Sequence, residues 1–286
     1  KIACYAAGSV GTNNYVISDD NGITAIIDCD GSPAPLYQYV EQNHLKVTHI
    51  LLTHGHYDHI GSVNEVAAHF GCKIVGAAKE MPVFTDPALN CSQFVGGPII
   101  VHPDILVSEG DKVTVGDMEF DVMETPGHTV GSICFIGKDI IFSGDTLFQG
   151  SCGRTDLPTG DWDDIKKSLK RLAALPGDYQ VYSGHGPATT LETERRTNPY
   201  MDNPKSKSGF RLAKTEEKQT SSISLKALKL AVFLAGSEFR LRIPFGKRIC
   251  FPSPSAALKL LCLQSEAVSE QKPLLLHYFI ILCFTG

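Results

Sequence analysis

The chain has 286 residues, of which 43% are hydrophobic and 20% charged, a composition typical of globular proteins and unlike that of disordered or fibrous ones. Its net charge of -5 at pH 7 gives no reason to expect nucleic acid or an anionic membrane surface as a partner. The nine cysteines include no Cys-x-x-Cys pair and are odd in number, which argues against a disulfide scaffold and favours a reducing compartment.

The N-terminal part of the chain predicts several strands and one helix. KIACYAAGSVGTNN lacks the long apolar run of a secretion signal, so we expect a cytoplasmic protein. The runs 14–17 and 23–29 flank the turn sequence SDDNG and predict a strand pair. THILLTH (48–54) is almost continuously apolar, as expected for a strand covered on both faces. A helix over 62–71, which ends in glycine, and a strand over 73–77 follow.

The following segments predict further strands and a second helix. The segment 84–104 has no clear period and is expected to be a loop. WDDIKKSLKRLAAL (162–175) is amphipathic with helical spacing. The remaining predicted strands are 113–125, 132–137, 139–145 and 180–185. This order of elements predicts layered sheets with helices outside.

Composition changes abruptly near Pro204. Residues 1–204 carry 13 lysines and arginines against 26 aspartates and glutamates, whereas residues 205–286 carry 13 against 5 and contain no aspartate. We expect a folded domain over 1–204 and a basic tail, rich in Ser, Leu and Lys, over 205–286. The tail is either a genuine appendage or a non-native extension. Its apolar run 274–284 is too short for a bilayer, which needs about 20 residues, so we expect no membrane span.

The stretch LLTHGHYDHIG (51–61) concentrates three of the ten histidines around one aspartate. His54, His56 and Asp58 recur at every second position after a predicted strand, and in extended chain such residues point to one side. His59 then points elsewhere, toward a second position. Imidazole and carboxylate groups are costly to bury unpaired. The pattern therefore predicts a cation site.

Further ligands are expected at the ends of other strands. His128 in TPGHT, Asp145 in FSGDT and His185 in YSGHG each follow an apolar run and are flanked by glycine. With the first stretch they make five histidines and two aspartates. A structural zinc takes four ligands, so seven residues are too many for one ion and suit two ions that share a carboxylate.

These motifs, together with GSCGRTDLPTGD (150–161) and GHGPATTLETERRTNPY (184–200), resemble the metallo-β-lactamase superfamily in its glyoxalase II-like branch. The resemblance covers residues 2–202 and implies an αββα sandwich with the metal site at one edge of the sheets. Carried over by position, it implies a first metal held by His54, His56 and His128, a second held by Asp58, His59 and His185, and Asp145 as the bridge.

The resemblance also implies the chemistry. Two divalent ions, most simply Zn²⁺ although such a ligand set also accepts Fe or Mn, lower the pKa of bound water to about 7. The metal-bound hydroxide then attacks the acyl carbon of a small thioester, as in hydroxyacylglutathione hydrolases, and Asp58 helps to orient it. Two cations facing two carboxylates and one hydroxide leave a net positive charge, which favours an anionic substrate.

Several alternatives stay open at this point. Classical glyoxalase II has a C-terminal helical domain that grips glutathione, which residues 205–286 do not match, and GHGPATT replaces its usual GHEYT. The carrier thiol, the acyl group and the oligomeric state are therefore open. One competing function is a mononuclear iron persulfide dioxygenase, and another is a lactone or β-lactam hydrolase. Near the site we expect Cys152 to be a packing residue, and Arg154 to pair with Asp156.

Overall fold

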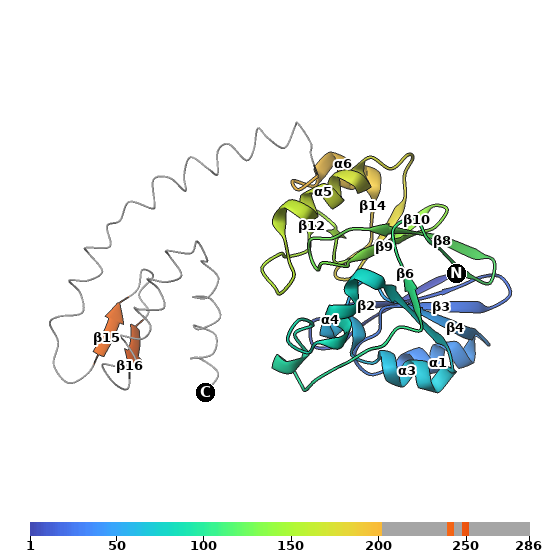
Figure 1. Ribbon diagram of the computed structural model, residues 1–286, viewed down its shortest axis with the longest axis horizontal. Helices are drawn as coiled ribbons and strands as arrows, with labels where there is room; N and C mark the ends of the chain where they lie inside the picture. Colours follow the sequence, from blue (N-terminus) through green and yellow to red (C-terminus); the bar gives the residue numbers. More distant parts are fainter. Residues whose placement is uncertain (202–238, 243–247, 252–286) are drawn as a thin grey trace. The chain divides into compact units, whose positions relative to one another are not determined.

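The computed structural model describes residues 1–201, 239–242 and 248–251 (Figure 1). The chain divides into two units, residues 1–209 and 210–286. Within the second unit, the described residues form the antiparallel pair β15 (Phe239–Arg242) and β16 (Arg248–Phe251). The expected domain boundary at Pro204, the apolar run 274–284 and most of the expected tail lie outside the described residues.

The first unit contains two six-stranded sheets that face each other. The first sheet has the strand order β1 (Ile2–Ala7), β2 (Thr12–Ser18), β3 (Ile23–Ile27), β4 (Lys46–Leu51), β5 (Lys73–Ala77) and β6 (Ile105–Val107). The second has the order β14 (Thr189–Thr190), β13 (Gln180–Ser183), β10 (Ile140–Gly144), β9 (Ile133–Ile136), β8 (Met118–Glu124) and β7 (Lys112–Val115). A small hairpin, β11 (Leu147–Phe148) with β12 (Ser151–Cys152), follows β10 in the chain.

Helices cover the outer face of each sheet (Figure 1). The first sheet packs against α1 (Ala34–Gln42), α3 (Val63–Phe70) and α4 (Met81–Thr85), and the second against α5 (Trp162–Ala173) and α6 (Leu191–Thr197). The helix α5 shows the local reason: Ile165, Leu169 and Leu172 form one buried stripe, while Asp161 caps the helix by accepting a bond from the Asp164 amide. This arrangement is an αββα sandwich, which confirms the expected fold class.

Side-chain alternation along the strands divides the core into three layers. In β3, Ala25 and Ile27 face the second sheet, whereas Ile26 faces the helices on the outer side. The largest fully buried side chains between the sheets include Phe120, Phe135 and Phe142. The central strands of both sheets are therefore buried on both faces, as the continuous apolar run before His54 predicted for its own strand.

The structure adds elements to those predicted from sequence. The predicted strands and both predicted helices are present with small shifts at their ends, and 113–125 forms the hairpin β7–β8, whose turn uses Gly116 at φ 57°. The elements that the sequence did not predict include β1, α1 and α6, the short strands β6, β11, β12 and β14, and the short helix α2 (Tyr57–Ile60). Within 84–104 they are the end of α4 and the short helix Ser92–Phe94. The strand β1 is only half covered, so its apolar pattern is weak.

The carboxyl ends of β3, β4, β8, β10 and β13 meet at one edge of the sandwich, because β3 is parallel to β4 and β10 is parallel to β13. Bonds between the sheets hold this edge together: the Tyr15 hydroxyl and the Asn13 side-chain amide donate to the Ser183 carbonyl at 2.7 and 2.9 Å. Among the described residues there is no helix with the length and apolarity to cross a membrane. The six cysteines within residues 1–201 are unpaired.

Candidate metal centre

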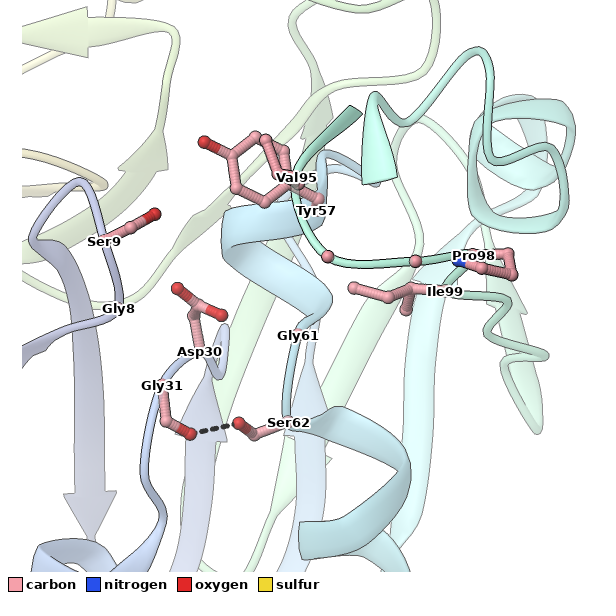
Figure 2. Close-up of a pocket in the computed structure, with 12 residues that line it drawn as sticks. Gly8, Ser9, Asp30, Gly31, Tyr57, Gly61, Ser62, Val95, Pro98 and Ile99 are labelled. Carbon is pink, nitrogen blue, oxygen red and sulfur yellow. Dashed lines mark hydrogen bonds between the residues drawn. The ribbon is translucent and has the colours of Figure 1, made fainter. Parts of the chain in front are cut away.

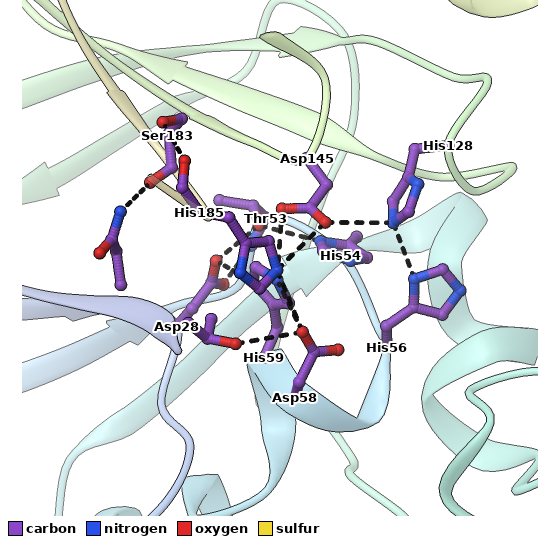
Figure 3. A network of polar contacts seen from close by, with 12 residues as sticks. Asp28, Thr53, His54, His56, Asp58, His59, His128, Asp145, Ser183 and His185 are labelled. Atoms are coloured by element: carbon purple, nitrogen blue, oxygen red, sulfur yellow. Dashed lines mark hydrogen bonds and ion pairs between the residues drawn. The ribbon is translucent and has the colours of Figure 1, made fainter. Parts of the chain in front are cut away.

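All seven residues predicted as ligands lie together at this edge (Figure 3). His54 and His56 follow β4, His128 lies in the loop after β8, and Asp145 and His185 follow β10 and β13. Asp58 and His59 lie in the short helix α2 (Tyr57–Ile60). Each side chain thus leaves the end of a strand or the turn after it, and Asp58 and His185, 127 positions apart in the chain, become neighbours.

Asp58 does not lie in extended chain, as its two-residue spacing from His56 had suggested. His56 has extended backbone (φ -65°, ψ 149°), but it is also the residue that caps α2, so Asp58 stands in the first turn of a helix. Helical geometry, not extended chain, turns Asp58 and His59 toward different parts of the centre. Two-residue spacing therefore accounts only for His54 and His56.

His54, His56 and His128 form the first group. One ring nitrogen from each lies within 4.8 Å of the others, and His56 Nδ1 is 2.8 Å from His128 Nε2. All three side chains are buried. Burial lowers the pKa of His54 and His128 and lowers that of His56 to about 3. The rings are therefore neutral, which is the form of imidazole that binds a metal ion.

The second group joins Asp58, His59 and His185, and Asp145 stands between the groups. His185 Nε2 is 3.2 Å from Asp58 Oδ2, and His59 Nε2 is 3.3 Å from Asp145 Oδ1. The other oxygen of Asp145, Oδ2, lies 3.5 Å from His128 Nε2 and 3.5 Å from His185 Nε2. One carboxylate therefore faces histidines of both groups.

The charges of the second group differ from those of the first. Burial disfavours the charged form of each side chain, but the mutual attraction of His59, His185 and the carboxylates outweighs it. The pKa of Asp145 is held well below its usual range, that of Asp58 is lowered to about 2, and that of His185 is raised to about 9. The pKa of His59 is also raised, by Asp145 first and then by Asp28 and Asp58. The carboxylates hold negative charge that a bound cation would neutralise.

Unsatisfied polar atoms test whether a metal fits these residues. Among the described residues, five buried side-chain nitrogens and oxygens make no hydrogen bond, and four of them belong to this cluster. They are His54 Nε2, His56 Nε2, His59 Nε2 and Asp145 Oδ1. Buried polar atoms in proteins almost always have partners, so their concentration here indicates a missing ligand. Imidazole nitrogens and carboxylate oxygens are donors that suit zinc, iron and manganese.

Three residues that sequence analysis missed hold the ligands in place. Asp28 accepts a bond from His59 Nδ1 at 2.7 Å and two more from the amide and hydroxyl of Thr53, at 2.8 and 2.7 Å. Thr12 donates its hydroxyl to Asp58 Oδ2 at 3.1 Å. Carboxylates behind metal-binding histidines fix the ring and raise its basicity. Asp28 lies near the end of the predicted strand 23–29, beside the strand that leads to His54, and this position was the signal that could have found it.

Glu80 is a further buried carboxylate beside the first group. Its oxygens accept the Gly55 amide at 2.9 Å and the Gly131 amide at 2.7 Å. These glycines belong to the two loops that carry His54, His56 and His128. Burial raises the pKa of Glu80 to about 7, although the two amides and Thr129 oppose the shift. No sequence pattern pointed to it, because Glu80 ends the short 3-10 helix Ala78–Glu80, which follows β5 and has no apolar period of its own.

In the loop of residues 150–161, Arg154 and Cys152 have the roles expected from the sequence. Arg154 and Asp156 pair through two bonds of 2.7 Å on the surface, while the Arg154 carbonyl accepts a bond from His128 Nδ1 at 2.7 Å. Cys152 is half-buried against the core under α5, and burial raises the pKa of its thiol to about 11. A thiol of that pKa is a weak nucleophile at neutral pH, in agreement with a packing role.

The family of the chain follows from its match to a family model. Residues 7–185 match the model of the metallo-beta-lactamase superfamily. The chain belongs to this superfamily. Most of its members are hydrolases, and the His/Asp cluster described above is the part of this chain suited to bind metal.

Known proteins resemble about two thirds of the chain. Hydroxyacylglutathione hydrolase GloC of Haemophilus influenzae is 37% identical over 196 residues, which cover 66% of this chain and 92% of that protein. The crystal structure of BLEG-1 B3 metallo-beta-lactamase is 36% identical with a TM-score of 0.67, over 71% of this chain and 100% of that one. The crystal structure of TTHA1623 in a di-iron-bound form is 33% identical with a TM-score of 0.63, over 69% and 99%.

Proposed function

We propose that the chain is a hydrolase that holds two divalent cations and cleaves a small thioester. His54, His56 and His128 hold the first cation, Asp58, His59 and His185 hold the second, and Asp145 bridges them. The observation that carries the proposal is the position of Asp145, whose Oδ2 lies 3.5 Å from a histidine of each group. A single site of four ligands would leave the other three residues of the cluster without a partner.

The cations, when bound, supply a water of lowered pKa and polarise the carbonyl of the substrate. The protein itself contributes positioned acceptors. Because the pKa of Asp58 is about 2, its carboxylate stays ionised at neutral pH and can accept a hydrogen bond from the attacking water. Thr12 donates to Asp58 Oδ2 and fixes the rotation of that carboxylate. No serine or cysteine nucleophile is required.

The substrate class rests on the relatives. The 37% identity to a hydroxyacylglutathione hydrolase supports a hydroxyacyl thioester, and the di-iron form of a relative supports iron beside zinc and manganese as the metal. A pair of divalent cations exceeds the charge of Asp58 and Asp145, which favours a substrate with an anionic group. The unpaired cysteines of the described residues support a reducing compartment such as the cytoplasm.

Metal analysis and a substrate panel test the proposal together. Protein purified without added metal or chelator is expected to contain about two ions of zinc, iron or manganese per chain and to hydrolyse S-lactoylglutathione. The variant Asp145→Asn is expected to lose at least one ion and the activity, whereas Asp163→Asn, on the exposed face of α5, keeps both. One iron per chain with oxygen uptake on a persulfide would overturn the proposal in favour of a dioxygenase. Cleavage of a lactone or β-lactam without thioester cleavage would overturn the substrate class.

A further inference from the structure

A cavity of about 590 Å³ opens beside α2 (Figure 2). One wall is the loop between β1 and β2, at Gly8 and Ser9. The opposite wall is α2 itself, from Tyr57 to Gly61, and the segment 95–99 contributes apolar side chains. Asp30, which follows β3, lines the cavity between these walls and points toward the space between Ser9 and Tyr57.

Asp30 brings a carboxylate into this cavity, which no basic side chain among the described residues lines. It is half-buried, and none of the described lysines, arginines or histidines forms an ion pair with it or lines the cavity. Its backbone is fixed, because the Asp30 amide donates to the Asn14 side chain at 2.7 Å. Burial raises the pKa of Asp30; the Gly31 amide opposes this shift, and the charges of Asp58 and His59 act in opposite directions.

Glycines on both sides make room for this carboxylate. A Cβ atom at Gly8 would lie 1.7 Å from one carboxylate oxygen of Asp30, and a Cβ atom at Gly61 would lie 2.0 Å from the other. The carboxylate therefore fits closely between the backbone of Gly8 and that of Gly61. A side chain at either glycine would displace it, so both glycines are needed to keep the carboxylate at the cavity.

The cavity shares the helix α2 with the metal centre. Tyr57 lines the cavity, and the next two residues, Asp58 and His59, belong to the second group of proposed ligands. A molecule in the cavity therefore contacts the helix that carries Asp58 and His59. A substrate that extends from the cavity to the centre meets opposite chemistry at its two ends: cations at the centre attract a carbonyl or an anionic group, and Asp30 attracts a positive one.

We propose that Asp30 binds a protonated primary amine of the substrate, so that this site selects thioesters that carry an ammonium group. The inference rests on the proposed function and adds a substrate feature to it. A charge-assisted hydrogen bond between an ammonium group and a half-buried carboxylate is stronger than a bond between neutral groups. An uncharged amide in the same place lacks the positive charge and loses most of this attraction.

A pair of substrates that differ only in the amine tests the inference. S-Lactoylglutathione has one primary amine, and its N-acetyl derivative has none. We expect the wild type to prefer the free amine in kcat/KM by about tenfold to a hundredfold, the effect of one hydrogen bond to a charged group. Asp30→Asn is expected to abolish this preference and to leave the rate on the N-acetyl derivative within about twofold. Asp20→Asn, an exposed residue in the β2–β3 turn, is the matched control and keeps the preference.

The outcomes separate this inference from the proposed function. No preference in the wild type, or an equal loss on both substrates in Asp30→Asn, would overturn the role of Asp30. Binding of S-methylglutathione and of its N-acetyl form, measured by calorimetry, covers the case in which no thioester is cleaved. If the amine form then binds more tightly in the wild type and not in Asp30→Asn, the proposed function fails and the role of Asp30 stands. If both forms bind alike, the role of Asp30 fails as well.

Discussion

Glu80→Gln is the change that most directly tests how the fold positions the first group of histidines. Glu80 is fully buried, and its two oxygens accept the amides of Gly55 and Gly131 at 2.9 and 2.7 Å. Glutamine keeps the size of the side chain but offers only one oxygen. One of the two glycine amides must then face an N–H group instead of an acceptor.

The size of the effect follows from the loss of that one bond. A buried donor left without its acceptor costs about 1–3 kcal/mol. In the metal-free protein the loops at Gly55 and Gly131 can shift to relieve this contact. With metal bound, His54, His56 and His128 hold the loops in place and the cost remains. We therefore expect the affinity of the first group for metal to fall by roughly 5- to 100-fold, since 1.4 kcal/mol corresponds to tenfold.

Competition with a chromophoric chelator measures this affinity, and Co²⁺ spectra distinguish the two groups of ligands. Glu41→Gln, at an exposed position of α1, is the matched control and should bind metal as the wild type does. Unchanged affinity in Glu80→Gln would refute the reasoning. So would a loss confined to the second group, because Glu80 touches none of its residues.

Three further predictions concern the second group and the pH dependence of stability. Asp28→Asn removes the carboxylate that lies 2.7 Å from His59 Nδ1, so metal content should fall from two ions toward one, with about 10- to 100-fold weaker binding; two tightly held ions would contradict this role. Gly184→Ala places a Cβ atom 2.2 Å from Asp145 Oδ1 and 2.6 Å from His59 Cε1, so we expect a folded protein by circular dichroism that lacks activity and metal, whereas full activity would show that the centre has more room. Burial raises the pKa of Glu80 from 4.5 to about 7, so its contribution to folding is fully present below about pH 4.5 and is lost as the pH rises through about 7. The unfolding free energy of metal-free wild type, relative to Glu80→Gln, should therefore fall by on the order of 3 kcal/mol between pH 4 and 8, and parallel curves in urea titrations would exclude this.

Local pattern was enough to predict most of the strands and the helices α3 and α5. Each of these segments has an apolar period and a turn or cap at its end, which are properties of neighbouring residues. The ligand motifs are also local patterns, because a His or Asp beside Gly directly after an apolar run indicates the end of a strand. The resemblance to a known superfamily then grouped the seven residues, and the structure brings all seven together.

The sequence by itself determined which side chains stand at the ends of strands, because that follows from short-range spacing. Only the tertiary structure decided what surrounds them. Asp28 meets His59, and Glu80 meets the loops of His54 and His128, through contacts between segments that lie 25 to 51 positions apart. Asp30 faces the cavity because Gly8 and Gly61 approach it from two other segments. Such contacts depend on how the two sheets and the loops pack, and no periodicity within one segment records that packing.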